Sequence, residues 1–161
     1  MAAVAVMAGI SLGAAACSSS PAAATYNPTT AKTDIAANYD TLFHFSTGTL
    51  ASKEAVIQDG TGLKTAMHQA LTSSESSAAQ GAKVDSVSFL STSQCTGKKL
   101  PTPCAKVKYD ILGSGGTAIL AGNTGYTVLV NGKWVVAKTT ICTLLGLFYT
   151  ASGKSGTPPG C

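Results

Sequence analysis

Residues 126–141 read YTVLVNGKWVVAKTTI, and this stretch decides the fold. Asn131 and Gly132 stand between two runs of mostly β-branched residues. This combination predicts a two-residue type I′ turn, because both central positions of that turn need a positive φ. The turn sets the strand register, which pairs Val130 with Lys133, Leu129 with Trp134, Val128 with Val135, Thr127 with Val136 and Tyr126 with Ala137.

Side chains of a strand alternate between the two faces of a sheet. One face of the predicted hairpin carries Thr127, Leu129, Trp134 and Val136, and the other carries Tyr126, Val128, Val135, Ala137 and Ile141. Both sets are largely apolar, so we expect both faces to be covered. Helices would cover one face, and a cavity or a partial cover would lie against the other. Trp134 is then either plain core or part of a cavity wall.

Three helices are predicted before the sheet. The first spans Ala31–Phe45 and is capped by Thr29 or Thr30. Its apolar stripe has helical spacing and consists of Ile35, Tyr39, Leu42 and Phe43. The second helix spans Ser52–Asp59 and is stopped by Gly60. The third runs from Leu63 to about Ser74.

The strands follow one another with short turns, which predicts an antiparallel meander. The ranges are Lys83–Ser93, Ala105–Leu112, Thr117–Ala121 with a bend or bulge at 122–125, and the central hairpin. Val107, Tyr109 and Ile111 alternate with charged residues and should face inward. The apolar run Ile141–Phe148 should be a strand end that passes into a short turn or helix. The expected fold is α+β, with N-terminal helices packed on a curved four-stranded antiparallel sheet.

The chain begins with MAAVAVMAGISLGAAAC, an apolar run shorter than the ~20 residues that span a bilayer. Residues 1–16 are predicted to be a signal peptide, and Gly13–Cys17 resembles a bacterial lipobox, in which the cysteine receives a diacylglycerol. The match departs from the motif because Ala14 stands at the usual Leu position. No Lys or Arg precedes Cys17, which suggests a start further upstream. Plain secretion with cleavage after Ala14–Ala16, or an apolar N-terminal helix, are the alternatives.

The remaining organisation follows from composition. Residues 17–30 form a lipidated cysteine and a flexible tether, which is small, polar and interrupted by proline. Residues 31–150 form one α+β domain, and residues 151–161 form a C-terminal tail. The chain is therefore expected to be exported and lipid-anchored at the extracytoplasmic face of the cell membrane, or secreted.

Four cysteines remain once Cys17 is set aside, and an even number in an exported chain predicts disulfides. Three pairings are possible. The shorter loops favour Cys95–Cys104, between adjacent strands, and Cys142–Cys161, which would fasten the tail. A metal site is the rival reading, but the chain has no CxxC spacing and its two histidines lie far from the cysteines. No metal or cofactor is expected.

The order of several segments resembles the low-molecular-weight secreted antigen family of actinobacteria, at its C-terminal domain. These segments are TLFHFSTGTLASKEAVIQDG (41–60), GLKTAMHQAL (62–71), AKVKYDILGSGGTAILAG (105–122) and NGKWVVAKTTICTLLGL (131–147). The resemblance covers about Ile35 to Leu147. It implies an exported, envelope-associated domain with a cystatin-like or nuclear-transport-factor-like fold and no known activity. The four extra cysteines and the lipobox-like start depart from the simplest members.

Several functions are disfavoured by the residues that are missing. All positive side-chain charges behind the net charge of +4 belong to Lys, because the chain contains no Arg. It therefore lacks the guanidinium group, which forms bidentate hydrogen bonds with bases and phosphates, and nucleic-acid binding is not expected. No GxSxG, HExxH or Walker sequence is present. Asp40 and His44, one helical turn apart, are the only acid–base candidates, and a surface pair is the alternative reading. His68 should be a boundary residue.

Two functional hypotheses remain. The first is a non-catalytic lipoprotein that binds a small apolar ligand or a lipid, in a pocket with Tyr39, Tyr109, Tyr126 and Trp134 as candidate lining residues. The second is a protein-interaction module or secreted antigen that meets an envelope protein through an exposed sheet face or edge. An enzyme that uses Asp40 and His44 ranks third.

Overall fold

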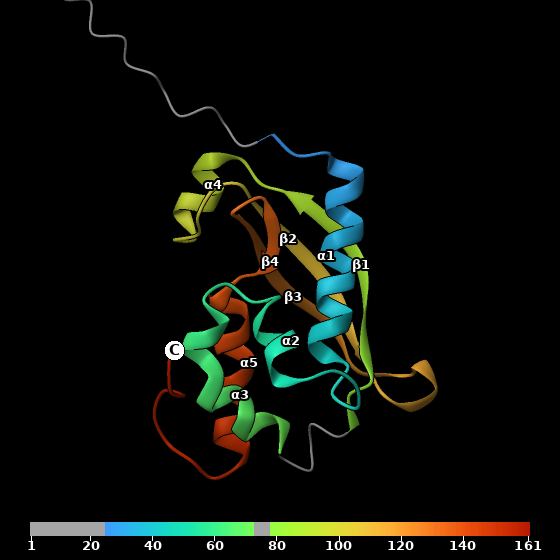
Figure 1. The fold of residues 1–161 in the computed structure, drawn as a ribbon, viewed down its shortest axis with the longest axis vertical. Coiled ribbons are helices and arrows are strands. Elements are labelled where there is room, and N and C mark those ends of the chain that lie inside the picture. The colour runs from blue at the N-terminus through green and yellow to red at the C-terminus, as the bar shows by residue number, and fades with distance from the viewer. Residues whose placement is uncertain (1–24, 73–77) are drawn as a thin grey trace, which may run out of the picture.

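A computed structural model of the chain describes residues 25–72 and 78–161. The predicted signal peptide, Cys17 and most of the tether lie outside these residues, so the predictions made for them stay predictions. Figure 1 shows the order of the elements. They are α1 (Pro28–Phe43), α2 (Leu50–Glu54), the 3₁₀ turn η1 (Gly60–Leu63), α3 (Lys64–Leu71), β1 (Gly81–Phe89), α4 (Thr92–Gly97), β2 (Cys104–Leu112), the 3₁₀ turn η3 (Ser114–Gly116), β3 (Ala118–Val130), β4 (Lys133–Val136) and α5 (Lys138–Ala151).

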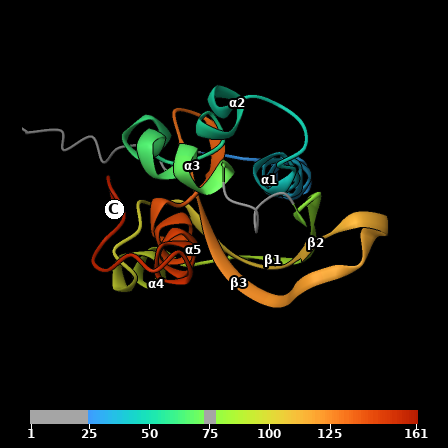
Figure 2. The same ribbon diagram turned by 90° about the horizontal axis from the view of Figure 1, so that it is seen from below.

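The four strands form one antiparallel sheet in the order β1-β2-β3-β4. The sheet curls into a half-barrel, and Figure 2 shows α1, α2 and α3 on its concave side. The predicted α+β class with N-terminal helices on a curved four-stranded sheet is therefore confirmed. Cα partners in β2 and β3 shift register near Ile111, where β3 bends.

The central hairpin has the predicted register. Val130 pairs with Lys133, Leu129 with Trp134, Val128 with Val135 and Thr127 with Val136. The Ala137 N–H donates to the Tyr126 carbonyl at 2.9 Å, so the pairing continues one residue further. Asn131 and Gly132 have φ values of 50° and 77°, as a type I′ turn requires.

Both faces of this hairpin are covered, as the two apolar sets predict. Trp134 and Val136 join the main core beneath α1, whereas Val128, Val135 and Ala137 belong to a second cluster with Cys95 and Cys104. The second face is thus covered by α4 and the loop before β2, not by a cavity. The prediction that Ile141 lies on this face is wrong, because Ile141 lies in α5 and packs into the main core.

Helix α1 starts earlier than predicted. Asn27 caps it, and its side chain accepts hydrogen bonds from the Thr29 and Thr30 N–H groups, so these threonines are not the cap. Pro28 occupies the first turn, where its missing N–H costs nothing. Pro28–Thr30, which the sequence places in the tether, are therefore helical. The stripe of Ile35, Tyr39, Leu42 and Phe43 is buried as predicted.

The segment after α1 is less helical than predicted. Helix α2 ends at Glu54, and Val56 to Gln58 run along the free edge of β4. The Gln58 N–H donates to the Val136 carbonyl at 2.9 Å, and the Val136 N–H donates to the Val56 carbonyl at 2.8 Å. These bonds satisfy part of an edge that would otherwise be open to pairing.

Two helices were not predicted as such. Residues after Phe89 form α4 instead of extending β1 to Ser93, and residues 138–151 form the 14-residue helix α5 instead of a strand end. The bulge or bend predicted at residues 122–125 is confirmed at its start: β3 continues through these residues, but three residue steps from Leu120 to Asn123 face two steps of β2, and Gly122 has a φ of 71°.

Candidate functional site

The acid–base candidates Asp40 and His44 lie at the surface. Their side chains are 55% and 36% exposed, and the His44 Nδ1 atom is 3.9 Å from the Asp40 Oδ2 atom. The other Asp40 oxygen accepts a hydrogen bond from the Ala82 N–H at 3.2 Å. Asp40 therefore joins the end of α1 to the start of β1, and neither residue lines one of the hollows described below. His68 is exposed on α3.

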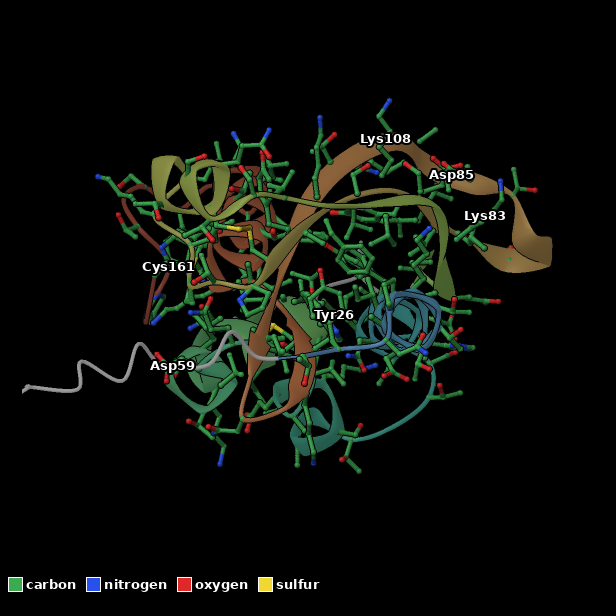
Figure 3. The ribbon with its side chains drawn as sticks, turned by 90° about the horizontal axis from the view of Figure 1, so that it is seen from above. Tyr26, Asp59, Lys83, Asp85, Lys108 and Cys161 are labelled. Atoms are coloured by element: carbon green, nitrogen blue, oxygen red, sulfur yellow. A yellow bond between two sulfur atoms is a disulfide. The ribbon has the colours of Figure 1, made fainter. Side chains whose placement is uncertain are left out.

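The four aromatic candidates do not line a single cavity, which corrects that prediction. Tyr39 and Tyr109 touch, with ring centroids 4.7 Å apart, and Tyr109 stacks on Phe43. Trp134 lies elsewhere, with Tyr26 at 5.0 Å and Phe89 at 5.5 Å. The sequence places Tyr26 in the tether, but its side chain packs against the main core (Figure 3).

A cleft of about 200 Å³ lies between β3 and α5. It brings together two of the four candidates, Tyr109 and Tyr126, with residues that were not predicted. The full lining is Tyr109, Asn123, Thr124, Tyr126, Thr139, Thr140, Thr143, Leu144 and Leu147. All nine residues are uncharged, and hydroxyl groups alternate with apolar surface.

Tyr109 is the more deeply placed of the two tyrosines that line this cleft. The residue is only 1% exposed, and its hydroxyl makes no hydrogen bond with the residues that the structure describes. Burial raises the pKa of Tyr109 to about 12, so the phenol is neutral at physiological pH. The hydroxyl oxygen is not one of the fully buried side-chain atoms without a partner, so it keeps some solvent access, and a ligand that offers a donor or acceptor there would take the place of water.

Hydrogen bonds with Thr140 and Tyr39 hold the backbone of Tyr126 at the cleft. The Thr140 hydroxyl accepts from the Tyr126 N–H at 2.7 Å, and the Tyr39 hydroxyl lies 3.3 Å from the Tyr126 carbonyl, to which it donates. Gly125 makes room for them, because a Cβ there would lie 2.5 Å from the Tyr39 hydroxyl. This close approach fixes α1, β3 and α5 relative to one another.

Two other hollows, of about 330 and 400 Å³, flank Trp134 between α1 and the hairpin turn. They share Asp34, Gly132 and Trp134. The Trp134 indole Nε1 is buried and has no hydrogen-bond partner among the described residues. Its ring is already enclosed by Tyr26 and Phe89, so the indole offers little surface to a ligand.

The four described cysteines form two disulfides, in the pairs that the short loops favour. Cys95 is bonded to Cys104, and Cys142 is bonded to Cys161. The second bridge fastens the tail to α5, and Pro158 of the tail is buried. Across residues 25–72 and 78–161, no three His, Cys, Asp or Glu side chains come together in a way that could hold a metal ion.

Comparison with protein-family models identifies a family. Residues 27–152 match the model of the low molecular weight antigen MTB12, C-terminal domain. The chain belongs to this family. The MTB12 C-terminal domain is a secreted antigen domain, which implies that the chain is exported. Comparisons with curated proteins and with solved structures found no match.

The match confirms the resemblance seen in the sequence, and it fits the observed elements. It begins at Asn27, the cap of α1, and ends at Ser152, the cap of α5, so the MTB12 domain comprises every helix and strand described here. Among the described residues, Thr25, Tyr26 and the tail that the Cys142–Cys161 bridge fastens lie outside it. Among the described helices, none is long and apolar enough to span a membrane.

Proposed function

We propose that this chain is a non-catalytic binding lipoprotein of the cell envelope, which holds a small uncharged ligand in the cleft between β3 and α5. The observation that carries the proposal is the cleft with its uncharged lining, which includes Tyr109, whose hydroxyl has no hydrogen-bond partner among the described residues. A few polar groups in an otherwise apolar hollow are typical of small-molecule sites.

The size of the cleft limits the ligand. A buried apolar cavity of about 150 Å³ accommodates benzene, so a cleft of about 200 Å³ suits a single ring or a short acyl segment. Because the lining is uncharged, a charged ligand would lose its hydration without gaining an ion pair. The expected ligand is mainly apolar and carries a hydroxyl that meets Tyr109.

A blocking substitution tests the site. Thr143 and Thr150 are both exposed on α5, and each hydroxyl donates to the carbonyl four residues earlier, but only Thr143 lines the cleft. Thr143→Trp should fill the cleft, and Thr150→Trp is its matched control. In NMR titrations with benzyl alcohol, we expect Thr143→Trp to weaken binding at least tenfold and Thr150→Trp to leave it unchanged. Equal affinity for both variants would refute the site.

A second pair of probes tests the role of the hydroxyl. Tyr109→Phe keeps the ring contacts with Tyr39 and Phe43 but removes the oxygen. One neutral hydrogen bond contributes about 1 kcal/mol, or roughly fivefold in affinity. The variant should therefore lose about fivefold for benzyl alcohol and nothing for toluene, which has no hydroxyl.

The lipid anchor at Cys17 is part of the same proposal. It is supported by the pairing of the other four cysteines with one another, which leaves Cys17 as the odd thiol of the chain. Intact-mass measurement of protein from the native host should show a diacylated N-terminal cysteine. Native mass spectrometry of the same sample would reveal a co-purified ligand.

A protein-interaction role is the second candidate, and exposed apolar side chains favour it. Ile119, Leu120 and Leu147 are 50%, 43% and 61% exposed. Leu147 also borders the cleft, so a partner could cover its mouth. Cross-linking through Leu147→Cys in the native envelope would capture such a partner, and recovery of uncross-linked protein alone would count against it.

A further inference from the structure

The convex side of the sheet carries lysines that lack acidic partners. Lys106 and Lys108 alternate with the buried residues Val107 and Tyr109 of β2, so they point away from the core. Figure 3 shows Lys108 projecting from this outer side. Their paired neighbours on the two flanking strands are all uncharged: Ser86, Ser88, Thr124 and Tyr126.

A third lysine reaches the same surface from α4. The Lys98 ammonium lies 5.2 Å from the centre of the Tyr126 ring, a cation–π contact, and Tyr126 is the cross-strand partner of Lys106. We call Lys98, Lys106 and Lys108 the outer lysine face. None of the three forms an ion pair with the described residues.

Lys83 of β1, in contrast, has an acidic partner. Lys83 lies 2.9 Å from Asp85, farther along the same side. Asp110 is the nearest acid along β2, and one of its oxygens accepts from the Gly122 N–H at 2.7 Å. Residues two apart on one face of a strand are about 7 Å apart, so Lys108 lies between Lys106 and Asp110 at similar distances, whereas Lys106 has no acid at that distance along β2 and would be stabilised by an anion from outside.

We propose that the outer lysine face lies against the anionic headgroups of the membrane to which the chain is anchored. This inference rests on the lipid anchor of the proposed function. The place where the chain enters the domain is compatible with this contact. Tyr26 packs on Phe89 with ring centroids 4.9 Å apart, on the concave face. Phe89 follows Ser88, the neighbour of Lys106 in β1, so the chain enters at the end of the sheet where Lys106 lies, but on the opposite face.

The anchor would hold the domain close to the bilayer. Eight residue steps separate Cys17 from Thr25, and they can span at most about 28 Å. Lysine suits this partner, because it acts as a mobile point charge and not as a rigid fork for one phosphate. Attraction to the headgroups acts within a Debye length of about 8 Å, so the domain must lie flat on the surface for all three lysines to contribute.

Vesicle binding by the full chain tests the proposal. Cys17→Ser removes the acylation site, so that binding reports the protein surface alone. Vesicles of phosphatidylglycerol with phosphatidylcholine should bind this chain at low salt, and pure phosphatidylcholine vesicles should not. Each lysine near an anionic surface contributes about fivefold, so Lys106→Gln/Lys108→Gln should weaken binding about 25-fold.

The control makes the same change in net charge elsewhere. Lys32 and Lys64 are exposed on α1 and α3, on the concave side of the sheet. Lys32→Gln/Lys64→Gln should weaken binding less than twofold. Equal losses in the two double variants, or no binding by the parent chain, would overturn the proposal. So would binding to soluble polyphosphate without binding to anionic vesicles, because the partner would then be a polyanion and not a membrane.

This result is separable from the tests of the proposed function. An unlipidated Cys17 in native protein would remove the anchor but leave the vesicle affinities as measured. Loss of vesicle binding in the Lys106/Lys108 variant would likewise leave benzyl alcohol binding intact, because neither lysine lines the cleft.

Discussion

Replacing Cys95 and Cys104 together by alanine is expected to lower the free energy of unfolding by about 3–4 kcal/mol. The two cysteines are 9 residues apart in sequence, and loop-closure entropy gives about 2.5–3 kcal/mol for a loop of this length. Both side chains are fully buried in the cluster beneath α4. Loss of the two sulfur atoms from this cluster adds about 1 kcal/mol.

The tail bridge provides the informative comparison. Cys142 and Cys161 are 19 residues apart, so loop length alone predicts a larger effect, of about 3–3.5 kcal/mol. However, among residues 152–161 only Pro158 is buried. Without the bridge this tail can detach while the domain stays folded. The native state then gains conformational entropy as the unfolded state does, so the free energy of unfolding changes little. We therefore expect Cys142→Ala/Cys161→Ala to cost about 1 kcal/mol or less.

Urea unfolding followed by Trp134 fluorescence measures both variants. Trp134 is the single tryptophan of the chain and is 4% exposed, so its emission should shift strongly when β4 unfolds. The reasoning fails if the tail variant is destabilised as much as the Cys95/Cys104 variant. It also fails if the latter loses under about 1 kcal/mol, because the bridge would then add little to the packing around it.

Three further substitutions test the interior. Gly125→Ala should destabilise the domain by about 1–3 kcal/mol in urea unfolding, because the new Cβ atom would lie 2.5 Å from the Tyr39 hydroxyl and 2.7 Å from the Thr140 Cγ2 atom. An unchanged free energy of unfolding would show that these two side chains move aside without cost. Burial raises the pKa of Tyr109 to about 12, whereas the pKa of tyrosine in the unfolded chain is about 10. The contribution of the neutral Tyr109 phenol to the free energy of unfolding is therefore complete below about pH 10 and is lost between about pH 10 and 12. Tyr109→Phe should remove this part of the loss of stability at alkaline pH. Tyrosinate absorbance and urea midpoints over this range would measure it, and identical pH profiles for variant and parent would contradict the assignment. Lys53→Met should cost about 1–3 kcal/mol, because the buried Lys53 ammonium donates to the Thr41 and His44 carbonyls at 2.9 and 2.7 Å; Lys64→Met, at an exposed site, is the control and should change stability by less than about 0.5 kcal/mol.

The sheet was predictable because its signals are local. A type I′ turn accepts few residue pairs, so Asn131-Gly132 set the register of β3 and β4. The alternation in β2 likewise placed Val107, Tyr109 and Ile111 inside. In each case the side-chain period of two leaves one arrangement that buries the apolar set.

The two helices that were not predicted, α4 and α5, have weak helical signals in the sequence, and other residues of the same segments favour strands. Residues 138–151 contain threonines and Ile141, which favour strands, and a short apolar run does not distinguish a strand from a buried helix. Ile141 and Leu145, four residues apart, are the buried positions that show the helical period. Helix α4 carries a clearer sign, the reciprocal capping of Ser91 and Gln94. Asn27 followed by Pro28 is a start signal of the same kind at α1.

Only one wall of the cleft could be predicted, because the sheet was predicted and α5 was not. Tyr109 and Tyr126 lie on predicted strands and were named as candidates. Its other wall is α5, so Thr139, Thr143 and Leu147 could not be placed without that helix. Trp134 was grouped with the two tyrosines because it lies in the adjoining strand. The curl of the sheet and the arrival of Tyr26 beside Phe89 are long-range features that separate it from them.

The close approach at Gly125 connects the cleft to the stability of the whole domain. Tyr39 reaches from α1 to the backbone of β3, and Thr140 reaches the same backbone from α5. A ligand that holds the Tyr109 hydroxyl would therefore bind at a junction of three elements that must all be in place. Ligand binding should consequently raise the urea midpoint by mass action, and Gly125→Ala, which disturbs this junction, should weaken the ligand and the fold together. The outer lysine face meets the cleft at Tyr126, which lines the cleft and packs against Lys98, so membrane contact should alter ligand binding if it moves this ring.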